Sequence, residues 1–263
     1  MPEQPTDADR RTLEFEIEVA GTPEEVWEAI ATGPGISSWY VPHRVEEREG
    51  GAAVARFGPG LEMEVPGRVA AWEPPARVVF DGGPGEEGLA FEWTIEARSG
   101  GTCTVRLVNS GFDSSAEWDA MYDGMAEGWP MFLLNLKLHR SHFPGRRATA
   151  MLPTGTWPGP RDRAWRALAA AVGLGPTPKI GDAVKLDDAA GPPLAGTVVD
   201  AAANRVALLL DEPAPGTAFV AAEGGLDAET SEVSIWAYLY GDDRDDLVAR
   251  DQGRWVSWLA DRA

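Results

Sequence analysis

Three histidines are the side chains of this sequence best suited to acid–base or metal chemistry. His43, in SSWYVPHR, could carry protons because an imidazole changes charge near neutral pH, but nothing close to it in the sequence supplies an orienting carboxylate or a nucleophile. His139 and His142, in HRSH, are spaced i and i+3 at the end of an expected helix, where a metal ion would need a third ligand from elsewhere. We therefore expect a solvated helix end there, and we assign no catalytic and no metal-binding residue.

The other reactive or ion-binding groups also favour structural roles. The single cysteine, Cys103, excludes an intrachain disulfide and a multi-cysteine metal site. In TCTVRLV it shares a strand face with Val105 and Leu107, which predicts a buried thiol. The acidic run DDRDD, residues 242–246, lacks the glycine and the terminal glutamate of an EF-hand loop. No phosphate-binding loop, dinucleotide fingerprint or G-x-S-x-G motif occurs, so we expect neither nucleotide chemistry nor a cofactor.

A larger group of aromatic and methionine side chains could line a binding site for a small molecule. Their strand and helix spacings would place them around the gap between a sheet and a long helix, where they would form either a filled core or an apolar pocket. Both alternatives stay open. Tyr40, Tyr122 and Asn109 could supply orienting hydrogen bonds inside such a pocket. The candidate cavity residues are Trp39, Tyr40, Phe57, Met63, Trp72, Phe80, Phe91, Trp93, Trp118, Met121, Tyr122, Met125 and Trp129.

The hydrophobic spacing indicates which elements position the N-terminal part of this group. LEFEIEV, residues 13–19, alternates as a half-buried antiparallel strand. It leads into TPEEVWEAIA, a short helix with a capping box between Thr22 and Glu25. Short runs separated by turn residues then predict one curved antiparallel sheet from about residue 44 to residue 109.

A long helix is expected after this sheet. A second capping box, Ser114 to Glu117, should begin it, and an apolar stripe at three- and four-residue spacing continues through about His142. Pro130 cannot donate its backbone hydrogen bond, which predicts a kink. The opposite face is polar, which argues against a membrane span; it includes Asp119, Asp123, Lys137 and Arg140.

The stretch PGRRATAMLPTGTWPGP, residues 144–160, is rich in Gly, Pro and Thr and marks a boundary, although ATAML could form a strand. We expect domains at residues 1–146 and 147–263. In the second, four segments resemble earlier ones in the same order: RAWRALAAAV and EEVWEAIA, GTVVDAAANRVALLLDEP and GRVAAWEPPARVVFD, SEVSIWAYLYGDD and TCTVRLVNSGFD, GRWVSWLADR and GWPMFLLNLK. This order favours a degenerate second copy. The alternative is an unrelated, smaller α+β domain.

The composition excludes some classes of partner. Lys and Arg total 23 against 42 Asp and Glu, so the formal net charge is −19, which disfavours nucleic acid and anionic membrane surfaces. The N-terminal MPEQPTDADRRT has no basic and apolar signal pattern, and no window approaches the length of an apolar spanning helix. We expect a cytoplasmic protein that is a monomer or a homodimer.

Four motifs carry a resemblance to a known family. They are TPEEVWEAIATGPGISSWY (residues 22–40), GRVAAWEPPARVVF (67–80), GGTCTVRLVNSGF (100–112) and GWPMFLLNLK (128–137). As a set they resemble the homologues of the activator of heat-shock protein 90 ATPase, in the START-like, or helix-grip, SRPBCC superfamily. The resemblance covers about residues 10 to 145. It implies an α+β fold with a curved antiparallel sheet wrapped around a long C-terminal helix, followed here by a second, smaller α+β domain.

The resemblance implies a fold and a cavity but no particular reaction, so three functions stay open. The leading hypothesis is a non-enzymatic START-like protein that binds an apolar or aromatic small molecule between the sheet and the long helix. The second is a chaperone ATPase co-regulator or another protein-interaction module, whose acidic surface would favour a basic partner. The third is a cyclase- or hydrolase-like enzyme using the same cavity, which requires His43 and a carboxylate to point into it with perturbed titration.

Overall fold

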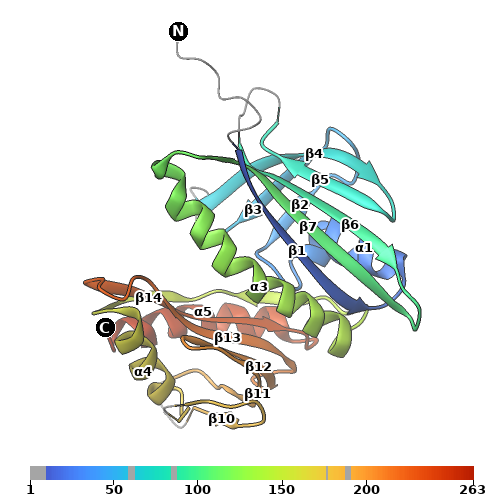
Figure 1. Cartoon of the computed structure of the whole chain (residues 1–263). Coiled ribbons are helices and arrows are strands. Elements are labelled where there is room, and N and C mark those ends of the chain that lie inside the picture. Colours follow the sequence, from blue (N-terminus) through green and yellow to red (C-terminus); the bar gives the residue numbers. More distant parts are fainter. Residues whose placement is uncertain (1–9, 59–62, 84–87, 176, 187–190) are drawn as a thin grey trace. The chain divides into compact units, whose positions relative to one another are not determined.

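The computed structural model describes residues 10–58, 63–83, 88–175, 177–186 and 191–263. The chain forms two compact units, Met1–Arg147 and Ala148–Ala263. Each unit combines one antiparallel sheet with helices, and Figure 1 labels their elements. The α+β class expected from the sequence is therefore confirmed.

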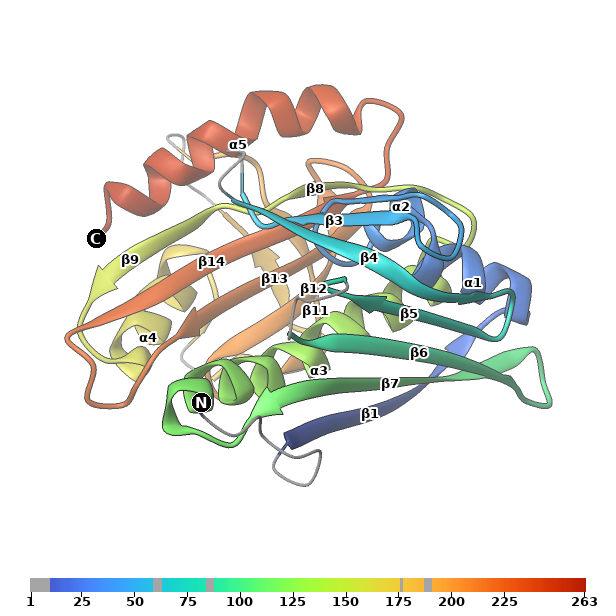
Figure 2. The same cartoon turned by 90° about the horizontal axis from the view of Figure 1, so that it is seen from above.

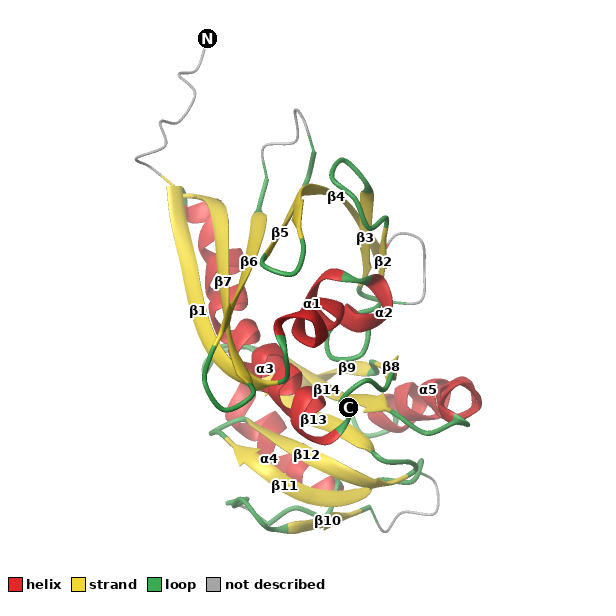
Figure 3. Ribbon diagram, turned by 90° about the vertical axis from the view of Figure 1, so that its right-hand side faces the viewer, coloured by secondary structure: helices red, strands yellow, loops and turns green. Residues whose placement is uncertain are grey.

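The first unit is built on a seven-stranded antiparallel sheet in the order β1-β7-β6-β5-β4-β3-β2. Two short helices lie between β1 and β2 in the sequence, and a long helix follows β7 after a single 3-10 turn. Figures 2 and 3 show the sheet curving from β1 towards β3, with α3 beside β1. This is the helix-grip arrangement that the sequence predicted. The elements are β1 (Arg10–Ala20), α1 (Pro23–Ala31), α2 (Gly33–Ile36), β2 (His43–Val45), β3 (Ala52–Arg56), β4 (Glu64–Glu73), β5 (Arg77–Asp81), β6 (Ala90–Ala97), β7 (Thr102–Asp113) and α3 (Asp119–His142).

Strand β1 forms one edge of this sheet and pairs with β7 along nearly its whole length. Its alternation follows the sequence pattern: Leu13 and Val19 are buried, whereas Glu14, Glu16 and Glu18 are exposed. On β7, the thiol of Cys103 is buried as expected.

Helix α1 begins where the sequence placed it. The Glu25 backbone N–H donates to the Thr22 hydroxyl at 3.4 Å, and the Thr22 N–H donates to the Glu25 carboxylate at 3.1 Å. This is the predicted capping box, and it satisfies two N–H groups that have no partner inside the helix.

The start of α3 differs from the prediction. No capping box forms between Ser114 and Glu117; instead Ser115 precedes a 3-10 turn, Ala116–Trp118, and makes no side-chain cap. The Asp113 carboxylate accepts the Ser115 N–H at 2.7 Å, so the preceding residue takes the capping role in a turn. The α-helix then runs from Asp119 through Pro130 to His142, and the kink at Pro130 stays a prediction.

The C-terminal end of α3 is not the solvated end that we expected. His142 is exposed, but His139 and Arg140 are buried, with 3% and 4% of their surfaces accessible. The guanidinium of Arg140 donates to the Ala20 carbonyl at 3.0 Å and to the Glu25 carboxylate at 3.0 Å. Arg140 therefore does not belong to the polar face, because partners far away in the sequence satisfy its charge within the fold.

The second unit has a sheet in the order β10-β11-β12-β13-β14-β8, and β9 also pairs with β14. Residues 149–151 of the boundary stretch form its first strand, as ATAML suggested, and DDRDD lies at the start of α5. The elements are β8 (Thr149–Met151), β9 (Thr154–Pro158), α4 (Arg161–Ala171), β10 (Ala183–Lys185), β11 (Ala195–Ala201), β12 (Arg205–Glu212), β13 (Gly216–Glu223), β14 (Thr230–Leu239) and α5 (Arg244–Ala260).

The two units share a connection order. In each, an early strand pairs with the last strand (β1 with β7, β9 with β14), a helix follows that early strand, and a longer helix follows the last strand. The strands can be matched by their order in each sheet, starting from the last strand: β14 corresponds to β7, β12 to β5 and β11 to β4. The helix that follows the last strand, α5, corresponds to α3. The four sequence pairs that suggested a repeat fall on these matching elements and on α4 and α1.

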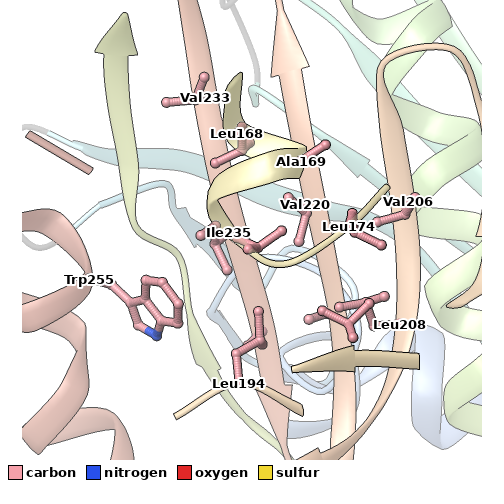
Figure 4. Close-up of a cluster of buried hydrophobic side chains, with 14 of the residues drawn as sticks. Leu168, Ala169, Leu174, Leu194, Val206, Leu208, Val220, Val233, Ile235 and Trp255 are labelled. Carbon is pink, nitrogen blue, oxygen red and sulfur yellow. The ribbon is translucent and has the colours of Figure 1, made fainter. Parts of the chain in front are cut away.

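The core of the second unit is packed with aliphatic and tryptophan side chains from both helices and the sheet. In Figure 4, Leu168 of α4 and Trp255 of α5 approach strand residues that include Val220 and Ile235. All four are buried. This core is separate in its residues from the core of the first unit, which draws on β1, α1, β7 and α3 among others.

Candidate ligand pocket

A pocket of about 440 Å³ lies within the first unit, bounded by side chains from α1, α2, β2 to β6 and α3. Its lining is mainly apolar and aromatic, and its volume lies in the range usual for small-molecule sites. The described lining residues are Ile30, Ile36, Trp39, Tyr40, His43, Ala53, Ala55, Phe57, Val65, Pro66, Gly67, Phe80, Asp81, Gly82, Leu89, Phe91, Trp93, Trp118, Met121, Met125 and Trp129.

Most of the aromatic and methionine residues singled out in the sequence meet at this pocket. The ten that line it are Trp39, Tyr40, Phe57, Phe80, Phe91, Trp93, Trp118, Met121, Met125 and Trp129. They come from the loop after α2, from the sheet and the residue that follows β3, and from the 3-10 turn and the first half of α3. The curvature of the sheet brings them together.

Three of the candidates have other positions. Trp72 packs edge-on against Trp27 of α1, with ring centroids 4.8 Å apart. The ring of Tyr122 lies 4.6 Å from the guanidinium carbon of Arg11. Met63 is 41% exposed and does not contribute to the lining.

The small residues of the lining were not among the candidates from the sequence. Ala53 and Ala55 point to the same side of β3 as Phe57, and Gly67 lies opposite Ala53 on β4. A β-carbon on Gly67 would approach the Asp81 carbonyl to 3.0 Å. Alternation along AAVARF was the available signal, since it places Ala53, Ala55 and Phe57 on one face. Small side chains on this face leave volume that larger ones would occupy.

Hydrogen bonds hold two buried tryptophans of the pocket lining, Trp39 and Trp129, in place. The Trp39 indole N–H donates to the Ala29 carbonyl at 2.8 Å, and the Asn135 amide donates to the Trp39 carbonyl at 2.8 Å. The Trp129 indole N–H donates to the side-chain oxygen of Asn109 at 3.2 Å. Asn109 thus positions the Trp129 ring but is not itself a lining residue.

Tyr40 and His43 bring polar atoms into this apolar lining. Burial raises the pKa of the Tyr40 hydroxyl far above its ordinary value. Burial also lowers the pKa of His43, an effect that its hydrogen bond with the Val41 carbonyl partly opposes. Both side chains are therefore uncharged at neutral pH.

A carboxylate also reaches the pocket, but its oxygens are already engaged. The Arg68 guanidinium donates to both oxygens of Asp81, at 3.1 and 2.8 Å, and these bonds hold the Asp81 pKa below its ordinary value. The Nδ1 atom of His43 instead contacts the Val41 carbonyl at 2.7 Å. Within the described residues, His43 therefore lacks the paired carboxylate that would orient and stabilise a catalytic imidazolium.

Apolar side chains remain accessible around the opening of the pocket. Phe57, Val65 and Met121 line the pocket and are 39%, 54% and 47% exposed. They belong to the β3–β4 side and to the first turn of α3. An apolar ligand could therefore contact hydrophobic surface before it enters.

Two further observations concern metal sites and membrane spans in the described residues. Across the described residues, no three His, Cys, Asp or Glu side chains gather closely enough to hold a metal ion. Over the same residues, no helix combines the length and the apolar character needed to cross a membrane.

Residues 20–139 match the family model described as Activator of Hsp90 ATPase homolog 1-like protein. The first unit has the START-like, helix-grip fold, and residues 20–139 within it carry this family-model domain. No curated protein sequence matches the chain.

Among solved structures, similarity extends to single-domain and two-domain proteins. The Aha1 dimer from Colwellia psychrerythraea is 21% identical and covers 51% of this chain and 99% of its own, with a TM-score of 0.43. Protein MLL2253 from Mesorhizobium loti is 21% identical and covers 51% of this chain and 100% of its own, with a TM-score of 0.43. The di-domain ARO/CYC BexL from the BE-7585A biosynthetic pathway is 15% identical and covers 95% of this chain and 92% of its own, with a TM-score of 0.45.

Proposed function

We propose that the START-like domain binds an apolar or aromatic small molecule in its pocket and holds it without a chemical step. The observation that supports this most directly is a pocket of about 440 Å³ surrounded by aromatic side chains. In a filled core these side chains would pack against one another at high density. The open pocket leaves apolar side chains accessible to water, and an apolar ligand would gain free energy by burying that surface together with its own.

Native mass spectrometry of the full chain, purified from its own host, tests this proposal. We expect an added small mass in the native spectrum that disappears when the protein is unfolded. A bare native mass would contradict it.

A matched pair of variants assigns the bound mass to the pocket. Ala55 lines the pocket, and a tryptophan there would occupy its volume. Ala52 is exposed on the same strand, on the opposite face. We expect Ala55→Trp to lose the added mass and Ala52→Trp to keep it. Retention of the mass by Ala55→Trp would place the ligand elsewhere.

A second candidate function is regulation of a chaperone ATPase. The family match over residues 20–139 favours it, because the family is described by that activity. The net charge of −19 would assist binding to a basic surface. The test is the ATPase rate of the host's Hsp90-type chaperone with and without the full chain. An unchanged rate, with no complex formed at low ionic strength, would count against this role.

A further inference from the structure

Two residues of the pocket lining each carry a polar side-chain atom without a hydrogen-bond partner in the part of the chain that the structure describes. These atoms are the hydroxyl of Tyr40 and Nε2 of His43, whose rings lie 5.5 Å apart between centroids. Two indole N–H groups of the lining already have partners: that of Trp39 donates to the Ala29 carbonyl, and that of Trp129 donates to the side-chain oxygen of Asn109. Tyr40 and His43 are both half-buried, so water can reach these atoms in the open pocket. A ligand that displaces this water must supply a hydrogen-bond partner to each atom, because an apolar ligand would leave them unpaired at a cost in affinity.

His43 has a defined tautomer. Its Nδ1 faces the Val41 carbonyl at 2.7 Å, and a carbonyl oxygen can only accept, so Nδ1 carries the proton. The neutral ring therefore presents Nε2 as an acceptor. The backbone of His43 is also held, because its N–H donates to the Ser37 hydroxyl at 2.9 Å. The acceptor is thus fixed in place before any ligand arrives.

Tyr40 is held by its neighbours in the same way. Its ring lies edge-on against Phe132 at 4.4 Å, and the ring of Trp129 lies 5.2 Å away. The Tyr40 N–H donates to the Ile36 carbonyl at 2.9 Å. A ring so packed cannot turn its hydroxyl towards another acceptor, so the hydroxyl remains available as a donor to a ligand.

The lining has no positive charge to offer an anion. No Lys or Arg is among the described lining residues, and His43 is neutral. The charged lining residue is Asp81, which is negative. A carboxylate entering this pocket would lose its hydration without gaining a cation, which is strongly unfavourable.

We infer that the pocket selects an uncharged ligand bearing a hydroxyl group, which donates to His43 Nε2 and accepts from the Tyr40 hydroxyl, over a carboxylate of the same size. The inference rests on the proposed function and specifies the class of molecule that it takes. A hydroxyl matches this pair because it is both donor and acceptor.

Three probes with one ring system test this selection: naphthalene, 2-naphthol and 2-naphthoate. Each is titrated at pH 7 into the ¹⁵N-labelled full chain, and the indole N–H signals of Trp93 and Trp129, which line the pocket, report binding. We expect 2-naphthol to bind about tenfold more tightly than naphthalene, the factor that one or two buried hydrogen bonds provide. We expect 2-naphthoate to bind more weakly than either.

Variants separate hydrogen bonding from pocket shape. Tyr40→Phe and His43→Leu should each reduce the preference for 2-naphthol over naphthalene while naphthalene still binds. His142→Leu, on the exposed end of α3, serves as the control and should leave the preference unchanged.

The outcomes distinguish this inference from the function on which it rests. Equal binding of naphthalene and 2-naphthol, or tightest binding of 2-naphthoate, would overturn the selection while leaving a ligand pocket in place. A preference that survives both Tyr40→Phe and His43→Leu would also overturn it. Failure of all three probes to shift the indole signals would contradict the pocket itself.

Discussion

The guanidinium of Arg140 occupies the space into which a β-carbon on Gly21 would project. Gly21 has a positive φ of 126°, in a region that side-chain-bearing residues rarely adopt. Arg140 reaches this position from the far end of α3 and donates there to Ala20 and Glu25. The turn between β1 and α1 and the end of α3 are therefore joined by one buried cation.

Gly21→Ala should destabilise the first unit by about 2 kcal/mol, because the new methyl group strains the backbone and displaces the Arg140–Glu25 pair. Urea denaturation followed by circular dichroism measures the change. An unchanged midpoint would show that the turn can relax without loss.

Gly128→Ala provides a contrasting glycine and should stabilise the protein by about 0.5 to 1 kcal/mol. Gly128 lies inside α3, and a β-carbon there would meet only Phe132, at 3.9 Å. Alanine has a higher helix propensity than glycine, and the site has room for it. The urea midpoint of Gly128→Ala should therefore rise, whereas that of Gly21→Ala should fall.

Asn109→Ala should cost about 2 kcal/mol, because it leaves the buried indole N–H of Trp129 without an acceptor. A double-mutant cycle with Trp129→Phe measures the coupling between the two residues. We expect the loss caused by Asn109→Ala to be smaller in the Trp129→Phe background, since no indole N–H remains unsatisfied there. Strictly additive losses would contradict a functional hydrogen bond between them.

Acidification should destabilise the first unit through His139. Burial, and secondarily the charge of Arg140, lowers the His139 pKa to about 4, against an ordinary value of 6.5. The unfolded chain therefore binds a proton at His139 more readily than the folded one. Above about pH 6.5 His139 does not reduce the free energy of unfolding, and between pH 6.5 and pH 4 this free energy falls as the pH drops. At about 1.4 kcal/mol per unit, the loss reaches about 3 kcal/mol.

Melting temperatures between pH 4 and pH 7 measure this effect. The melting temperature of His139→Gln should decline less with falling pH than that of the wild type. The decline that remains includes a contribution from His43, because burial lowers its pKa as well. His142→Gln, at the exposed end of the same helix, should follow the wild-type curve. Identical curves for His139→Gln and the wild type would contradict the assignment.

Two cores with no residue in common predict two unfolding transitions. Leu107→Ala removes a buried side chain from the first core, and Leu168→Ala removes one from the second. Each should lower the melting temperature of one transition in differential scanning calorimetry, since such truncations cost about 2 to 5 kcal/mol. If each variant lowered both transitions equally, the proposal of two domains, at residues 1–146 and 147–263, would fail.

Local patterns were sufficient to predict β1, α1 and the class of the fold. The alternation of LEFEIEV and the Thr22–Glu25 box depend on residues close together in the sequence, and the structure reproduces both. The start of α3 was predicted wrongly because Asp113 and Ser114 both have capping side chains. The Asp113 carboxylate is the one that accepts a backbone N–H, from Ser115.

Features that depend on distant partners could not be predicted. Arg140 looked solvated because its acceptors, Ala20 and Glu25, lie more than a hundred positions away. Trp72 follows a register shift between Val69 and Ala71, which interrupts the simple alternation along β4. The pocket volume depends on where Ala53 and Ala55 leave space, and small residues give a weaker sequence signal than the aromatic rings around them.

The exposed glutamates of β1 have a consequence for self-association. β1 is an edge strand of eleven residues, and such an edge offers unpaired N–H and C=O groups to any other extended chain. A second copy pairing there antiparallel would bring Glu14, Glu16 and Glu18 against their own counterparts. Like charges on directly opposed strands repel. The glutamates that mark the solvent face of β1 therefore also disfavour edge-to-edge pairing of two copies through this strand.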